Sequence, residues 1–364
     1  MKKIILVLCV LFILFSSCTH RENKKEISNL RTFVDTIGFA HTAMQTDSVL
    51  ARIYRTQDDK LKTALSKYNN NFESKLIISP HDDYSYVGYL YPAITESIKA
   101  KTIIFFGVAH KAKLLGLEDK IIFDSYSYWK EPYGKVKTSK FRKQIIKLLP
   151  KNTYMVNDSM QSIEHSVEAI IPFLQKKNHD IQIISILVPY MSFETMDKIA
   201  KPLSVAIKTI AEKNNLSWGK DYAFVISTDA VHYGDQDWGT SKLNFFGSDT
   251  SGYKKAIKYE HEIIDNCLTG NLNVEKIKKF INYTVNKDDY KKYKWSWCGR
   301  YSVPLGLLTS YYLQNSLNKN LYGKYIGYTT SIDHKHIKVD DLKMGVTAPA
   351  NIHHWVGYAA IAYH

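Results

Sequence analysis

LIISPHDDYSYVGYL, residues 76–90, places a short apolar run directly before a proline, a histidine, two acids and several tyrosines. An apolar run of four residues that ends at a proline is typical of a buried strand. His81 therefore follows the end of that predicted strand and faces whatever gathers there.

Two later segments repeat this arrangement. Residues 102–107 (TIIFFG) are strand-like and come just before His110, and residues 222–228 (YAFVIST) are strand-like and come just before Asp229 and His232. In an open parallel sheet, ligand crevices form at the carboxyl ends of the strands. We therefore expect three histidines and at least one carboxylate to meet at one rim, as a metal site requires.

The rest of the chain alternates predicted strands with predicted helices. Residues 181–188 (IQIISILV) form the most strand-like segment, Ser192 is placed to cap the helix after it, and residues 356–363 form a closing strand. This alternation predicts an α/β fold of three layers, with a mostly parallel central sheet flanked by helices. Because the composition does not change along the chain and no repeat occurs, we expect one domain over residues 31–364.

The first 18 residues resemble a bacterial lipoprotein signal peptide. Lys2 and Lys3 precede an apolar stretch that is too short for a spanning helix of about 20 residues, and the stretch ends in FSSC at Cys18. Residues 19–30 then form a polar tether. We expect lipidated Cys18 to anchor the chain to a membrane of the bacterial cell envelope; a plain secretory signal, giving a secreted or periplasmic protein, is the alternative.

The net charge of +14 does not point to nucleic acid, because the lysines are dispersed rather than collected in a block. We therefore expect no nucleic-acid partner. The chain also lacks G-x-G-x-x-G, P-loop, H-E-x-x-H, G-x-S-x-G and paired C-x-x-C motifs. The common nucleotide-binding, zincin, serine-hydrolase and zinc-ribbon functions are excluded on that ground.

The two cysteines after Cys18 have different settings, so we expect no disulfide between them. Cys267 lies near the apolar side of a predicted helix and is interpreted as a buried structural thiol. Cys298 precedes a helix predicted to start near Pro304, where a thiol ionises more readily and can bind metal.

His81, His110 and Cys298 are therefore the predicted metal ligands. Each histidine alone is better explained as a hydrogen-bonded loop residue, so their joint placement at strand ends carries the hypothesis. Asp229 and His232 are candidates for general acid–base work or for orienting the ligands.

Glu164 and His165 stand near a predicted helix start and could also orient ligands; a helix cap with a core histidine is the alternative. The remaining paired histidines lie in polar, loop-like segments, and we expect them at the surface: His334, His336, His353 and His354.

In order along the chain, these motifs resemble those of the Memo family, called AmmeMemoRadiSam system protein B in prokaryotes. The resemblance covers most of the chain after the tether. The matching blocks are Pro80-His81 through Gly88 (P-H-A-G-Y-x-Y-x-G), 107–110 (G-P-S-H-H), 164–168 (E-H-S-x-E), 227–234 (S-S-D-x-x-H-W-G), 298–300 (C-G-R) and 357–360 (S-Y-A-A).

This resemblance implies a fold similar to the class III extradiol dioxygenases, which hold non-haem iron at strand ends. It also implies a metal site on His81, His110 and Cys298, with Asp229 and His232 beside it. Iron or copper is the metal it implies, with zinc less expected, and redox activity toward an unknown small molecule.

Departures from the family pattern concern the surroundings of the metal. Asp82 and Asp83 replace an alanine and a glycine, which we expect to add negative charge, and Tyr301 replaces the histidine after C-G-R. We expect Asp82 and Tyr301 beside the ligands. Three functions stay open: a metal-dependent oxidoreductase, a non-catalytic module that binds a metal or a protein partner, and a metal-assisted hydrolase in which Asp229 activates water.

Overall fold

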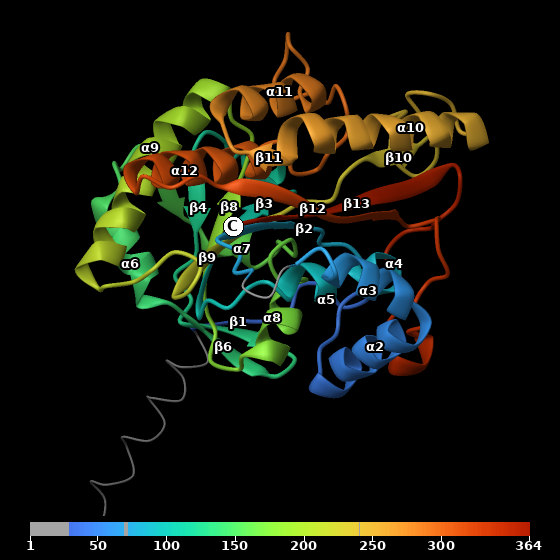
Figure 1. The fold of residues 1–364 in the computed structure, drawn as a ribbon, viewed down its shortest axis with the longest axis horizontal. Helices are drawn as coiled ribbons and strands as arrows, with labels where there is room; N and C mark the ends of the chain where they lie inside the picture. Colours follow the sequence, from blue (N-terminus) through green and yellow to red (C-terminus); the bar gives the residue numbers. More distant parts are fainter. Residues whose placement is uncertain (1–28, 69–71, 240) are drawn as a thin grey trace, which may run out of the picture.

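The computed structural model describes residues 29–68, 72–239 and 241–364 (Figure 1). The predicted signal peptide, Cys18 and all but the last two residues of the predicted tether lie outside the described residues. Within the described ranges, no helix combines the length and the apolar character that crossing a membrane requires.

A mixed sheet crosses the middle of the molecule, and its central strands are parallel (Figure 1). The predicted segments around residues 76, 102, 181 and 222 are all strands of this parallel part, because each is an apolar run that can be buried on both faces. The parallel strands, in spatial order, are β6 (Gly134–Thr138), β8 (Gln182–Val188), β3 (Thr102–Val108), β9 (Tyr222–Ser227) and β2 (Leu76–Ser79).

Antiparallel pairs extend the sheet on both sides of this centre. The closing strand β13 pairs with β2 and, through β12 and β11, forms one side. The short β1 is parallel to β5, which forms a hairpin with β6. These outer strands are β1 (Leu30–Arg31), β4 (Ile121–Phe123), β5 (Tyr128–Glu131), β7 (Tyr154–Val156), β10 (His232–Gly234), β11 (Gly270–Asn271), β12 (Tyr322–Thr330) and β13 (His354–Tyr363).

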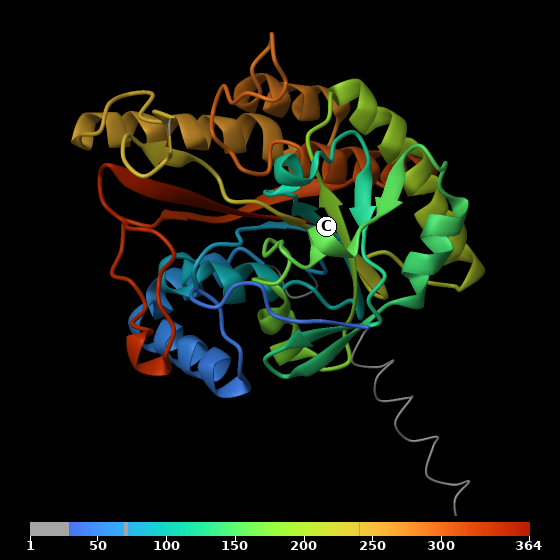
Figure 2. The same ribbon diagram turned by 180° about the vertical axis from the view of Figure 1, so that it is seen from behind.

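Helices cover both faces of the sheet, as Figures 1 and 2 show from opposite sides. On one face lie α6 (Lys140–Leu148), α9 (Phe193–Lys213), α10 (Thr250–Ile263), α11 (Val274–Thr284) and α12 (Ser302–Ser316). On the other face lie α2 (Ala43–Thr56), α3 (Asp58–Leu65), α4 (Tyr84–Val87), α5 (Leu90–Thr95) and α8 (Ile171–Lys177).

Two hydrophobic clusters fill the two spaces between sheet and helices. Ile104 and Phe106 of β3 belong to the cluster under α9 and α12, whereas their neighbours Ile103 and Phe105 belong to the cluster under α2 and α5. Successive strand residues thus point to opposite faces, and both faces are apolar. The predicted three-layer α/β fold with a mostly parallel sheet is confirmed.

The helix predicted to start near Glu164 begins later, at Ile171. Residues 164 and 165 are irregular and residues 166–170 form turns, because their polar groups bond elsewhere: the amide of Ser166 donates to the Glu164 carboxylate and the Ser166 hydroxyl donates to the Val108 carbonyl. Pro172, which suits the first turn of a helix, marks the true start. The predicted Ser192 cap of α9 is confirmed, since its hydroxyl accepts a hydrogen bond from the Thr195 amide.

Candidate metal centre

The ends of the parallel strands and the turn before α12 bring the predicted ligands together. His81 follows β2, His110 follows β3, and Cys298 lies four residues before Ser302, the first residue of α12. One ring nitrogen of each histidine and the cysteine Sγ all lie within 4.8 Å of one another. The three residues are therefore close enough for their donor atoms to share one ion.

His81 is held in one tautomer by two serines. Its Nδ1 lies 2.6 Å from the Ser227 hydroxyl, which donates its only proton to the Ser166 carbonyl at 2.5 Å. The imidazole must therefore donate through Nδ1, which leaves a lone pair on Nε2. That Nε2 lies 3.5 Å from the Cys298 Sγ, and the side chain is 2% exposed.

The Glu164 carboxylate orients His110, again through the Nδ1 atom of the ring. Its Nδ1 lies 2.9 Å from Glu164 Oε1, and its backbone amide donates to Oε2 at 2.7 Å. Burial would raise the pKa of Glu164, but the adjacent His110 and the hydrogen bonds outweigh burial and lower that pKa to about 2. Because this carboxylate accepts the Nδ1 proton, His110 too keeps a lone pair on Nε2, as ligand histidines do.

The Cys298 thiol is buried against Asp229. Its Sγ accepts a hydrogen bond from the Asp229 amide at 3.1 Å and is 4% exposed. Burial first, and the Asp229 carboxyl second, raise the pKa of this thiol well above its ordinary value. The prediction that a position near a helix start favours the thiolate is therefore wrong for the metal-free chain. Burial raises the pKa of the thiol by more than the helix start can lower it. A cation must displace the thiol proton when it binds.

Asp229 and His232 form a second donor set with Cys298, again within 4.8 Å. Asp229 Oδ1 accepts the His81 amide proton at 2.9 Å, while Oδ2 lies 3.5 Å from His81 Nε2 and 4.0 Å from His232 Nε2. Burial raises the pKa of Asp229 well above its usual range and lowers that of His232 to about 3. Both shifts disfavour the charged form of the group, because neither side chain is solvated.

The Nε2 of His232 is buried and has no hydrogen-bond partner among the described residues. An orphaned buried nitrogen of this kind is costly unless something binds it. Like the Nε2 lone pairs of His81 and His110, it is available to an incoming group.

His165 adds a third imidazole to the cluster. Its ring is stacked on that of His110, with centroids 5.0 Å apart and planes 6° apart, and lies 5.8 Å from the ring of His81. It shares a third donor set with His110 and Glu164. With 34% of its side chain exposed, against 2% for His81, it lies toward solvent.

Asp82 and Asp83 carry less negative charge than the sequence suggests. The Asp82 carboxyl accepts the Tyr358 hydroxyl at 2.6 Å, and the Asp83 carboxyl accepts the Thr347 amide at 2.6 Å. Burial raises the pKa of Asp82, and burial together with Asp82 raises that of Asp83 to about 8. The expectation of added negative charge is corrected accordingly, because neither group is well solvated.

Tyr301 is turned toward another loop. Its hydroxyl donates to the Tyr290 carbonyl at 2.5 Å and accepts from Arg300 Nε at 3.0 Å. These bonds tie the turn after Cys298 to the loop at Tyr290, so Tyr301 supports the site only through the backbone.

Two features of the site were missed from the sequence. Ser227 orients His81, and the only signal for it is a serine ending an otherwise apolar strand, beside Ser79 at the end of β2. His354, expected at the surface, is 3% exposed and stacks on Trp238 at 3.9 Å, which in turn contacts His232. The side chain of His334 is also nearly buried, at 4% exposed.

Both remaining cysteine predictions are confirmed: Cys267 and Cys298 are free, and Cys267 is buried.

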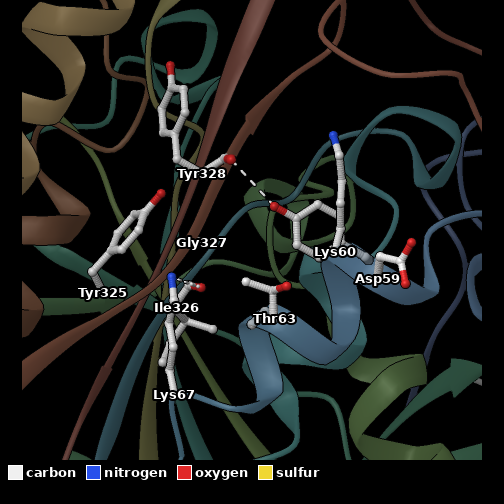
Figure 3. A pocket seen from close by; sticks show the side chains of 10 residues that line it. Asp59, Lys60, Thr63, Lys67, Tyr325, Ile326, Gly327 and Tyr328 are labelled. Carbon is white, nitrogen blue, oxygen red and sulfur yellow. Dashed lines mark hydrogen bonds between the residues drawn. The ribbon is translucent and has the colours of Figure 1, made fainter.

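A pocket of about 340 Å³ lies apart from this centre, between α3 and β12 (Figure 3). Lys67 donates to the Ile326 carbonyl at 2.9 Å and lies over the Tyr325 ring, so this lysine already has its partners. None of the candidate ligands lines the pocket.

The chain resembles known proteins over most of its length. A family model described as Memo-like protein matches residues 47–342, a range that contains every candidate ligand. The chain is 28% identical over 166 residues to a MEMO1 family protein of Pyrococcus horikoshii, covering 43% of this chain and 52% of that protein. It is 25% identical to one of Pyrococcus furiosus (48% and 58%) and 26% identical to one of Methanococcoides burtonii (56% and 73%). The chain thus spans about half the length of the two Pyrococcus relatives it matches.

Proposed function

This chain belongs to the Memo-like protein family, and we propose that it is a metal-dependent redox protein whose transition-metal ion is held by His81, His110 and Cys298. One observation carries the proposal. Two imidazoles, each with its Nδ1 proton already committed, bring one ring nitrogen apiece and one sulfur within 4.8 Å of one another. Buried histidines of a plain protein core do not need this arrangement.

The donor chemistry fits iron or copper. Imidazole and thiolate ligands suit copper, iron and zinc, whereas calcium and magnesium take oxygen ligands. Three protein ligands leave at least one coordination position open. A bound iron or copper ion would supply one-electron chemistry and a place for a small molecule.

The residues around the ligands are in protonation states suited to moving protons. Burial raises the pKa of Asp229, which favours its protonated form, and lowers the pKa of His232 to about 3, which favours the neutral imidazole. The first group is therefore suited to donate a proton and the second to accept one. His165, the more exposed imidazole, stands where a small molecule would enter. The identity of that molecule is for the experiment to find.

The first test is metal loading of the purified protein. We expect about one iron or copper ion per chain after anaerobic loading, measured by elemental analysis, and little metal in His81→Ala. His353→Ala is the matched control, because the His353 side chain is 43% exposed and bonds only Asp235 among the described residues. Absence of stoichiometric metal from the wild-type chain would contradict the proposal.

Oxygen uptake by the loaded protein tests the redox part. With a reductant present, we expect the loaded wild-type protein to consume oxygen faster than His81→Ala does. Bound metal without any turnover would instead favour a non-catalytic metal-binding module, and activity on esters or amides with zinc alone would favour the hydrolase.

We also propose that lipidated Cys18 holds the protein on a membrane of the cell envelope, which the sequence of residues 1–18 supports. Membrane fractionation of the producing bacterium tests it. We expect wild-type protein in the membrane fraction and Cys18→Ser in a different form, uncleaved or soluble. An unchanged distribution and mass in Cys18→Ser would contradict the anchor.

A further inference from the structure

We propose that Glu260 of α10 is a positioning residue that fixes Cys298 and His232 relative to the histidines on the strand ends. This inference rests on the proposed function, because it concerns the same metal centre. Glu260 is fully buried and contacts neither an ion nor a candidate ligand side chain in its hydrogen bonds.

Four hydrogen bonds converge on the Glu260 carboxylate. Oε1 accepts both indole N–H groups, from Trp295 at 2.5 Å and from Trp297 at 2.6 Å. Oε2 accepts the Val231 amide at 3.1 Å and the Tyr328 hydroxyl at 3.3 Å. Among the described residues no cation pairs with Glu260, so these four donors alone compensate the buried charge.

Three of the four donors come from the two segments that carry candidate ligands, and the fourth, Tyr328, comes from β12. Val231 immediately precedes His232, and Trp297 immediately precedes Cys298. The His232 segment pairs with β13, but among the described strands the Cys298 segment meets it only in an isolated bridge between Val231 and Trp297. Glu260 therefore joins the two segments through a side chain that belongs to neither.

Further contacts keep these two segments together once Glu260 has joined them. The His232 amide donates to the Ser296 carbonyl at 3.1 Å, and the Ser296 hydroxyl donates back to the His232 carbonyl at 2.5 Å. A shift of Trp297 would therefore be transmitted both to Cys298, its neighbour in the chain, and to His232.

The packing around Glu260 leaves room for this cluster. A Cβ at Gly357 would lie 2.3 Å from the Tyr328 hydroxyl and 3.3 Å from Glu260 Oε2. Gly357 also pairs by backbone with the segment that precedes His232: its amide donates to the Val231 carbonyl, and its carbonyl accepts the Ala230 amide. The absence of a side chain at Gly357 is what allows both contacts.

Removing the carboxylate would leave buried indole and amide N–H groups without acceptors. They would have to move to find new partners, and Trp297 would carry Cys298 with it. Glu260→Gln keeps the size of the side chain but places a donor where an acceptor is needed, so it disturbs the cluster with the least loss of volume.

The test uses Co²⁺ alone as the probe, because cobalt bound to a thiolate shows a charge-transfer absorption. The full chain is titrated at about pH 8, where Glu260 is ionised, since burial raises its pKa to about 7. We expect Glu260→Gln and Trp297→Phe to weaken Co²⁺ binding by about 10- to 100-fold and to shift the thiolate band.

Two controls separate positioning from general stability. Tyr328→Phe removes one bond to the same carboxylate, but from a strand without candidate ligands. Trp218→Phe makes the same indole substitution where the N–H bonds Lys75, at the start of β2 and away from His81. We expect both to leave the affinity and the band within about twofold of wild type.

The outcomes are distinguishable. Equal effects of Trp297→Phe and Tyr328→Phe, or no effect of Glu260→Gln on affinity and band, would overturn this inference while the proposed function stands. A wild-type chain that binds no Co²⁺, iron or copper would overturn both. If Glu260→Gln fails to fold, Trp297→Phe against its two controls decides the question.

Discussion

At the scale of single residues, the hydrogen bond from His81 to Ser227 makes a direct prediction. Ser227→Ala removes the acceptor that holds the Nδ1 proton, so the imidazole can turn or change tautomer. We expect metal affinity to fall by about tenfold, measured by competition with a chelator. Ser79→Ala is the control, because Ser79 is the register partner of Ser227 and equally buried, yet among the described residues its hydroxyl bonds only the neighbouring Pro80 carbonyl. Equal losses in both variants would contradict the role of Ser227.

The Cys298 thiol makes a second prediction, on pH. Burial and Asp229 raise the pKa of this thiol, and only the thiolate binds metal, so binding must release a proton. Metal affinity should therefore rise about tenfold per pH unit in the neutral range. Calorimetry in buffers of different ionisation heat measures the released protons. Cys298→Ser should release about one fewer; an unchanged number would show that the thiol does not ligate.

At this scale, the sequence predicts the ligands but not what holds them. His81 and His110 are visible because each follows an apolar run. Ser227 bonds His81 across 146 positions and Glu260 bonds Trp297 across 37, so no local pattern announces either contact. The protonation of Cys298 was mispredicted for the same reason: burial depends on the packed fold, which local sequence does not report.

At the scale of elements, the close packing of α12 on the sheet explains why Cys298, just before α12, lies near the ends of the parallel strands. A Cβ at Gly306 would lie 2.5 and 2.6 Å from Ile226 of β9, so only glycine allows this approach. Alanine normally stabilises a helix relative to glycine by about 0.5–1 kcal/mol. We expect the clash to reverse that sign in Gly306→Ala, with a net loss of about 1–2 kcal/mol in urea unfolding and weaker metal binding.

Asn315→Ala is the control for this prediction, because Asn315 lies in the same helix but is exposed. It should be neutral or slightly stabilising. A Gly306→Ala variant as stable as Asn315→Ala would show that α12 can shift away from β9 without cost.

Elements whose sequence pattern has one interpretation are predictable here, and the others are not. The parallel strands β2, β3, β8 and β9 are continuous apolar runs and α9 follows a serine cap, so the sequence predicts them, whereas the polar parallel strand β6 carries no such signal. The apolar spacing after Glu164 predicts a helix start there, but residues 164–170 are not helical. Their polar side chains instead bond the end of β3, a competition that spacing alone does not reveal.

At the scale of the whole molecule, the fold keeps several carboxyl groups away from water, and this has a consequence for stability. Burial raises the pKa values of Asp82, Asp229 and Glu260, with Glu260 reaching about 7. A carboxyl whose pKa is higher in the folded than in the unfolded chain holds its proton more firmly when folded. Such groups stabilise the protein in acid and lose that contribution as pH rises.

For Glu260 the direction and the pH range are specific. Its ordinary pKa is 4.5, so its contribution should be full below about pH 4.5 and should be lost as pH rises through about 7. A shift of this size corresponds to roughly 3 kcal/mol. Gln at this position cannot titrate, so the difference in free energy of unfolding between wild type and Glu260→Gln should move against wild type by up to that amount from about pH 5 to pH 8. Urea unfolding at both pH values measures this change, and taking the difference between the two proteins cancels the contributions of the other buried carboxyls.

Glu262→Gln, an exposed neighbour on α10, should show no such trend. A difference that is independent of pH would mean that Glu260 is ionised throughout, with its four donors compensating the whole cost of burial.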